Sequence, residues 1–314
     1  MLQRSLCERD PRWAQRFWRY FRRNWVYYLL VLPAVLEILI FKYFPIYGVQ
    51  IAFRRFKASE GILGSEWVGL KYFIQFVELP SFWSLLRNTL FLSVYSLAFG
   101  FPLPIVLALL LNEQHNPTLK KVTQMVTYMP HFISTVAVVG IIEFMVDRQA
   151  GIINVIRRAM GLDAIAFLGE SGAFRTMYVV SDIWQHTGWS AIIYLAALTS
   201  VDMEALEAAR IDGANQLQVN WYINIPTILP TIVVMLVLRC GSLLSVGFEK
   251  AYLLQNARNL DVSEIIATYT YRMGILQGQF SYTSAIGLFN NIINGIILIF
   301  VNAVSKKLGN ASLW

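Results

Sequence analysis

Long apolar runs, separated by shorter polar stretches, dominate this chain. A helix needs about 20 apolar residues to cross a bilayer, and six runs approach or exceed that length. They extend from about Trp25 to Phe44, Thr89 to Leu111, Met125 to Val146, Met177 to Leu198, Thr227 to Val246 and Ala285 to Val304. Lipid cannot satisfy backbone N–H and C=O groups, which favours helices. The pattern therefore predicts an all-α, polytopic transmembrane helical bundle of about six spans.

The composition also favours a membrane protein. Of the 314 residues, 56% are hydrophobic and 14% are charged, whereas soluble domains usually carry about 25% charged residues. Seven of the 26 basic residues lie in the first 23 positions. The positive-inside rule then places the N-terminus in the cytoplasm, beside anionic lipid. The net charge of +7 thus indicates contact with membrane lipid and predicts no nucleic-acid partner.

Six spans that start inside also end inside, so both termini are expected in the cytoplasm. We predict a basic amphipathic N-terminal segment over residues 1–24, a transmembrane domain over 25–304 and a C-terminal tail over 305–314. The polar segment 200–226 then falls on the cytoplasmic side. The two cysteines, Cys7 and Cys240, lie far apart in this scheme and predict no metal site.

The 200–226 segment carries four acidic residues, among them Asp202 and Glu204, and one basic residue, Arg210. An acidic inner loop departs from the positive-inside rule, which is explained if the loop docks on a protein. Asp202 is suited to cap a helix, and Glu204 would lie in its favourable first turn.

Small and apolar residues follow at near-helical spacing: Leu206, Ala209, Gly213 and Leu217. They predict one stripe that packs on a surface, with a bend at Gly213. The segment is therefore expected to form a helix–turn–helix, although an ordinary interfacial loop helix would share these features.

The order of residues in this loop carries a family resemblance. Glu207-Ala208-Ala209 is followed at fixed spacing by Gly213 and by Ile223-Asn224-Ile225-Pro226. This resembles the EAA motif of type I ABC-importer permeases, with Ile225 where leucine is usual. Asp212-Gly213-Ala214 matches the DGA that is common in the same motif.

Three other elements are similar to the carbohydrate-uptake branch of that family: Trp67–Phe73, Arg87–Leu90 and Gly151–Asn154. The resemblance covers roughly residues 25 to 305. Within the branch, the chain looks most similar to polysaccharide and oligosaccharide permeases, alginate importers included.

The resemblance implies a type I ABC-importer permease fold in a bacterial plasma (inner) membrane, without a catalytic centre. It implies a second permease subunit in a heterodimer, two cytoplasmic ATPase subunits and a periplasmic or surface solute-binding protein. No GxxxxGK[ST] loop occurs, so ATP and Mg are expected on the partner ATPase and no cofactor or metal on this chain. The residues expected to couple to the ATPase are Glu207, Ala208, Ala209, Asp212 and Gly213.

Polar and aromatic residues inside the spans are candidates for a substrate path, because polar groups in membrane helices usually face a wet interior. The candidates are Glu143, Asp182, Trp184, His186, Trp189, Arg239, Asn290 and Asn294. Arg239 would suit an acidic, alginate-like sugar. It could equally form a structural salt bridge with Glu143 or Asp182.

Other functional classes remain open at this point. A polytopic membrane enzyme could use His131, Asp182 and His186, although no HExxH motif occurs. A secondary transporter or channel driven by an ion gradient would fit six spans, but leaves the EAA-like loop unexplained. An ABC permease for a substrate other than sugar would share the same motif.

Overall fold

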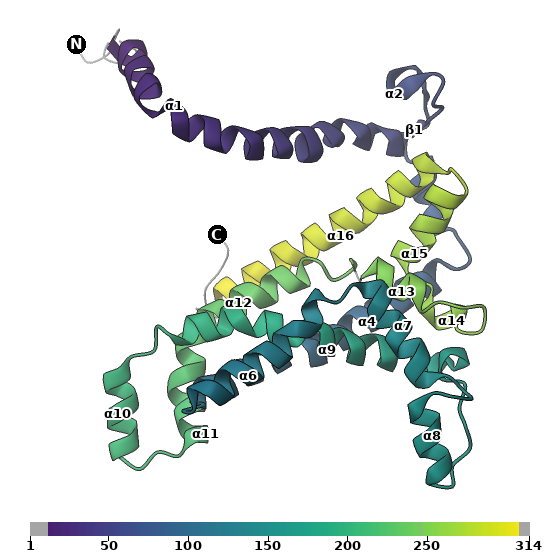
Figure 1. The fold of residues 1–314 in the computed structure, drawn as a ribbon. Coiled ribbons are helices and arrows are strands. Elements are labelled where there is room, and N and C mark those ends of the chain that lie inside the picture. Colours follow the sequence, from purple (N-terminus) through teal and green to yellow (C-terminus); the bar gives the residue numbers. More distant parts are fainter. Residues whose placement is uncertain (1–11, 246, 308–314) are drawn as a thin grey trace. The chain divides into compact units, whose positions relative to one another are not determined.

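A computed structural model describes residues 12–245 and 247–307, most of them helical (Figure 1). The chain divides into two compact units at Val68, and each is described by itself. Residues 1–11 of the predicted basic segment, which include Cys7, lie outside the described residues. So do residues 308–314 of the predicted tail.

The first unit is built on one long apolar helical stretch, Trp18–Phe53, in which Ala52 alone is buried. Its parts are α1 (Arg12–Ile38), the π-helical turn η1 (Leu39–Tyr43) and the 3-10 segment η2 (Phe44–Phe53). The unit ends in β1 (Arg54–Arg55), the short helix α2 (Gly61–Gly64) and β2 (Glu66–Trp67), with the two strands paired antiparallel. This stretch exceeds the predicted first span at both ends.

The second unit contains the remaining membrane helices. They are α4 (Phe82–Gly100) with α5 (Pro102–Glu113), α6 (Pro117–Tyr128) with η3 (Met129–Phe132) and α7 (Thr135–Val146), α9 (Ser171–Leu198), α12 (Ile225–Cys240) and α16 (Phe280–Lys307). Among the described residues, four helical stretches are long and apolar enough to cross a membrane, or up to six if each of two bent pairs counts as one span. The predicted all-α bundle of about six spans is confirmed.

Two predicted spans differ from the observed helices. The third is bent by 99° between Pro117–Phe132 and Thr135–Val146. Ile133 is extended at the break, and the Ser134 hydroxyl accepts from the Ala137 N–H to cap the following helix. The predicted fifth span extends to Val246, but its helix ends at Cys240. Apolar composition continues past both helix ends, so hydropathy alone could not locate them.

Helix α9 lies at the centre of the second unit, where it contacts α4, α5, α6 and α12. Its C-terminal half packs through Tyr194 in a cluster with Ala108 of α5 and Ile228 of α12. Its N-terminal half packs through Phe174 and Tyr178 in a second cluster. This central helix can therefore carry polar groups between several neighbours.

Gly188 on α9 permits a close backbone approach to α6. A Cβ there would overlap the carbonyl of Thr127, whereas a Cβ at Gly287 on α16 would have no neighbour within 4 Å. Because backbone atoms cannot give way, we expect Gly188→Ala to destabilise the unit by about 1–3 kcal/mol or more. Gly287→Ala serves as the matched control. Thermal unfolding in detergent would reveal the difference, and equal midpoints for the two variants would contradict the close packing.

The loops that were predicted to lie outside the membrane form short helices. These are α3 (Lys71–Val77), α8 (Ile152–Ala159), η4 (Phe167–Gly169), α13 (Phe248–Leu253), α14 (Leu260–Ser263), α15 (Ile266–Tyr271) and η6 (Arg272–Leu276).

Asparagine side chains tie these loops together. The Asn154 amide donates to the carbonyls of Val146, Asp147 and Ile165, and its oxygen accepts from the Ile165 N–H. Asn88 on α4 donates to two carbonyls near α14, those of Asp261 and Glu264. Both asparagines belong to motifs noted in the sequence, and both act here as loop anchors.

Candidate transport path and coupling loop

The polar loop folds as the predicted helix–turn–helix. Asp202 caps α10 (Met203–Ile211) by accepting from the Glu204 N–H at 2.9 Å. Gly213 turns the chain with a φ of +80°, a conformation that glycine adopts at little cost. Asn215 then starts α11 (Gln216–Val219) with a reciprocal capping box to Gln218.

The loop is anchored to the adjoining ends of the spans by Leu206 and Val219, which are buried in the cluster that contains Ala108, Tyr194 and Ile228. The predicted stripe is therefore wrong in its second half, because Leu217 is 80% exposed. The positive φ at Gly213 ends the first helix, and the Asn215 cap begins a new one. The helical phase does not continue across the turn, so Val219 faces inward instead.

The motif residues lie on the solvent-exposed side of this loop. Glu207, Ala208, Asp212 and Gly213 are exposed and Ala209 is half-buried. Apolar side chains lie exposed beside them, including Ile211 at 86%. A polar rim around exposed apolar groups is typical of a protein-binding surface.

A second contact joins the loop to α5. The Asn220 amide donates to Glu113 at the C-terminal end of α5, and the Asn224 amide donates to Asn220 Oδ1 at 2.6 Å. Asn220 and Asn224 bound the π-helical segment η5 (Asn220–Asn224), which leads into α12. A movement of the loop would therefore be passed to both α5 and α12.

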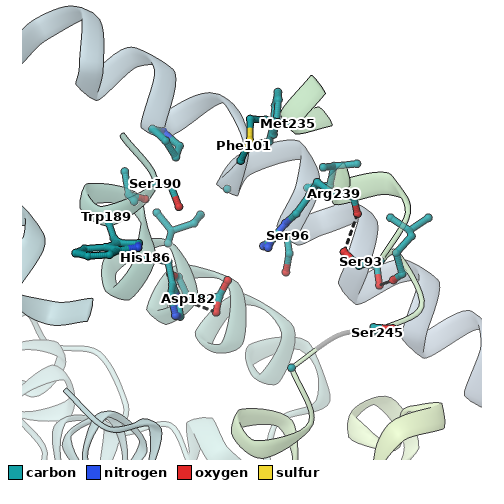
Figure 2. A pocket seen from close by; sticks show the side chains of 18 of the residues that line it. Ser93, Ser96, Phe101, Asp182, His186, Trp189, Ser190, Met235, Arg239 and Ser245 are labelled. Atoms are coloured by element: carbon teal, nitrogen blue, oxygen red, sulfur yellow. Dashed lines mark hydrogen bonds and ion pairs between the residues drawn. The ribbon is translucent and has the colours of Figure 1, made fainter. Parts of the chain in front are cut away.

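A cavity of about 600 Å³ lies between α4, α5, α9 and α12. Four of the eight predicted path residues line it: Asp182, His186 and Trp189 from α9, and Arg239 from α12. Figure 2 shows Asp182 and Arg239 directed into the same space from opposite sides. The volume falls in the range of about 300–1,000 Å³ that is usual for small-molecule sites.

The other four candidates lie elsewhere. Glu143 lines a separate cavity of about 580 Å³, and Trp184 is 49% exposed and absent from the central cavity. Asn290 does not line it either. Asn294 is buried and accepts from the Leu244 N–H while donating to Ser245. Asn294 thus holds the chain after α12 in place.

The charges in the cavity are paired differently from the suggested structural salt bridge. Asp182 Oδ1 lies 3.1 Å from Lys250 Nζ and 3.3 Å from His186 Nδ1. Arg239 has no carboxylate within 4.0 Å among the described residues, so neither Glu143 nor Asp182 pairs with it. The cavity thus contains an exposed guanidinium without a counter-ion from this part of the chain.

The remaining lining combines aromatic and hydroxyl side chains with aliphatic ones. Tyr178 and Tyr194 come from α9, and Ser93 and Ser96 come from α4. The hydroxyls of Ser96 and Thr187 are buried without a hydrogen-bond partner in the described chain. Aromatic faces stack on sugar rings and hydroxyls bond to sugar hydroxyls, so this lining suits a carbohydrate.

Sequence reasoning missed Ser93, Ser96 and Lys250. Serine is common in membrane helices, so the hydroxyls had no distinguishing pattern. Lys250 falls in a predicted outer loop, although its side chain is only 4% exposed. The described residues contain no group of three His, Cys, Asp or Glu side chains arranged to hold a metal ion. His131, a candidate of the enzyme alternative, stacks flat on Trp189 with ring centroids 4.6 Å apart.

Comparisons with known proteins agree with the motif. Residues 100–310 match the family described as binding-protein-dependent transport system inner membrane component. The chain is 45% identical over 287 residues to the polygalacturonan/rhamnogalacturonan transport system permease protein YteP of Bacillus subtilis, which covers 91% of this chain and 89% of that protein. It is also 45% identical over 294 residues to protein LplB of the same organism, covering 93% and 92% of the two chains.

Solved structures show the same fold. One is a crystal structure of a bacterial ABC transporter involved in the import of the acidic polysaccharide alginate, with 37% identity, a TM-score of 0.85 and coverage of 93% of this chain and 99% of that chain. Another shows the bacterial alginate ABC transporter in complex with an alginate pentasaccharide-bound periplasmic protein, with 36% identity, a TM-score of 0.86 and coverage of 95% and 100%. The family match covers about two thirds of the chain, and the relatives cover nearly all of it. This protein therefore belongs to the binding-protein-dependent transport system inner membrane component family and is a permease subunit of an ABC importer.

Proposed function

We propose that this chain forms half of the membrane path for acidic oligosaccharides, and that Arg239 binds their carboxylates. The observation that carries the proposal is the exposed Arg239 guanidinium in the central cavity, which has no carboxylate partner among the described residues. A guanidinium that is exposed in a cavity and has no carboxylate partner is available to bind an anion that enters it. A uronate carboxylate supplies that anion with the planar geometry that a guanidinium binds well.

The relatives support the class of cargo. One relative is named for the transport of polygalacturonan and rhamnogalacturonan. The matched structures belong to an importer of alginate. All three are polymers with carboxylate-bearing sugars, and the aromatic and hydroxylic lining of the cavity suits the sugar ring itself.

Transport needs partners that this chain does not supply. We infer a second permease subunit that completes the path and differs from this one in sequence, because the branch favours heterodimers, and a solute-binding protein that delivers the cargo. We also infer two cytoplasmic ATPases that bind ATP and Mg. The exposed EAA loop would insert into an ATPase cleft through Glu207 and Gly213, with both chain termini on the same cytoplasmic side of the bacterial inner membrane.

The test uses the complete complex reconstituted in liposomes. A labelled galacturonate oligosaccharide is offered beside its carboxyl-reduced, neutral counterpart of the same length. We expect at least about a tenfold preference for the acidic form, the factor that about 1.4 kcal/mol of differential binding produces. Equal uptake of both sugars would refute the acidic cargo, and uptake of amino acids or peptides instead would refute the sugar class.

A further inference from the structure

The chain after α12 does not continue as a helix but folds across the outer end of the central cavity. Residues 241–254, of which Val246 is not described, are called the outer segment here. Because α12 begins at the inner loop and ends at Cys240, this segment lies at the outer end of the path. Ser242, Leu243, Ser245 and Gly247 from it line the cavity.

Side chains from three spans hold the outer segment. Ser93 on α4 donates to the Leu243 carbonyl, and Asn294 on α16 accepts from the Leu244 N–H at 3.0 Å. The Tyr178 hydroxyl on α9 donates to the Gly247 carbonyl at 3.3 Å. These contacts involve the segment's backbone.

One contact is ionic. Lys250 Nζ lies 3.1 Å from Asp182 Oδ1 on α9, and its side chain is only 4% exposed. The same ammonium lies 5.8 Å from the centroid of the Tyr178 ring. Asp182 faces the cavity and remains 24% exposed. The pair therefore joins the buried side of the outer segment to the wall of the transport path.

We propose that the Asp182–Lys250 ion pair is the latch that keeps the outer segment closed over the cavity, and that the pair separates when the path opens outward. A buried ammonium is expensive without its counter-ion, so Lys250 stabilises the closed position only while Asp182 is beside it. In an outward-open path both groups would reach water, and neither charge would be left buried alone. The pair can thus be joined in the closed state and separated in the open state without leaving a charge buried alone, as a gate requires.

The first experiment removes both charges together in the complete complex. Asp182→Asn with Lys250→Met leaves no buried charge without a partner. We expect the ATPase rate measured without binding protein to rise at least about fivefold, the lower end of usual allosteric couplings. The matched control is Glu264→Gln with Arg272→Met, which removes an ion pair of 2.7 Å within the outer loops. A wild-type ATPase rate in the latch variant, assembled at normal yield, would overturn the proposal.

The second experiment locks the segment. Asp182→Cys and Lys250→Cys are introduced into a chain whose native Cys7 and Cys240 are replaced, and the pair is joined by a short, reducible bis-methanethiosulfonate reagent. We expect uptake to fall to about a tenth or less after cross-linking and to recover with reductant. Uptake by the single-cysteine variants should change with neither the reagent nor the reductant. Undiminished uptake by the cross-linked complex would show that the segment does not move. Both readouts are independent of whether the cargo is acidic.

Discussion

A complex with Arg239→Gln should take up an acidic oligosaccharide at least about tenfold less efficiently than the wild type. A hydrogen bond to a charged group contributes about 1.5–3 kcal/mol, and each 1.4 kcal/mol corresponds to about a factor of ten. Arg239 is exposed in the cavity and has no carboxylate partner among the described residues. Its loss therefore removes a contact to the cargo and leaves no carboxylate of the described chain without a partner.

The comparison that assigns this effect to the permease uses one binding protein throughout. The binding protein also selects the cargo, so a difference between Arg239→Gln and the wild type must arise in the membrane path. Uptake of the neutral, carboxyl-reduced sugar should change little in the variant. Arg239→Lys keeps the charge but loses the two-pronged geometry, and we expect it to retain an intermediate rate. Equal losses of uptake for acidic and neutral sugars would mean that Arg239 supports the fold and does not bind the carboxylate of the cargo.

The number of spans and the coupling loop could be predicted because each depends on a local pattern. Bilayer thickness fixes the length of an apolar helix, so the runs of the sequence became the helices of the bundle. The Asp202 cap and the Gly213 turn follow from the conformational preferences of those residues alone. The motif spacing then identified the family without any knowledge of packing.

Features that depend on tertiary structure could not be predicted in the same way. Lys250 and Asp182 are 68 positions apart, and no periodicity connects them. Leu217 is exposed and Val219 is buried because the turn at Gly213 reset the helical phase. Asn294 looked like a candidate for the path, yet its amide satisfies the backbone that follows α12. In each case the partner of the side chain, and not the residue type, decides its role.

Charge reversal in the coupling loop should weaken the contact with the ATPase and lower transport and ATP hydrolysis together. We expect Glu207→Lys to reduce both uptake and the binding-protein-stimulated ATPase rate at least about 30-fold, since disrupting a buried charge contact at an interface costs about 2–5 kcal/mol or more. The Glu207 side chain is exposed and forms no ion pair within the described chain, so the permease itself should fold normally. Co-purification with the ATPase measures the loss of the contact. Thermal unfolding of the permease measures any loss of its own stability.

Glu204→Lys is the matched control for this prediction. It makes the same charge change on the same exposed helix, three residues earlier and outside the motif. Its own cost is the loss of a favourable charge near a helix N-terminus, about 0.3–1 kcal/mol, which is too small to abolish assembly. If the ATPase binds the loop through the residues of the EAA motif, only Glu207→Lys should weaken co-purification. Equal behaviour of the two variants would mean that the general acidity of the loop, and not the position of Glu207, determines the contact.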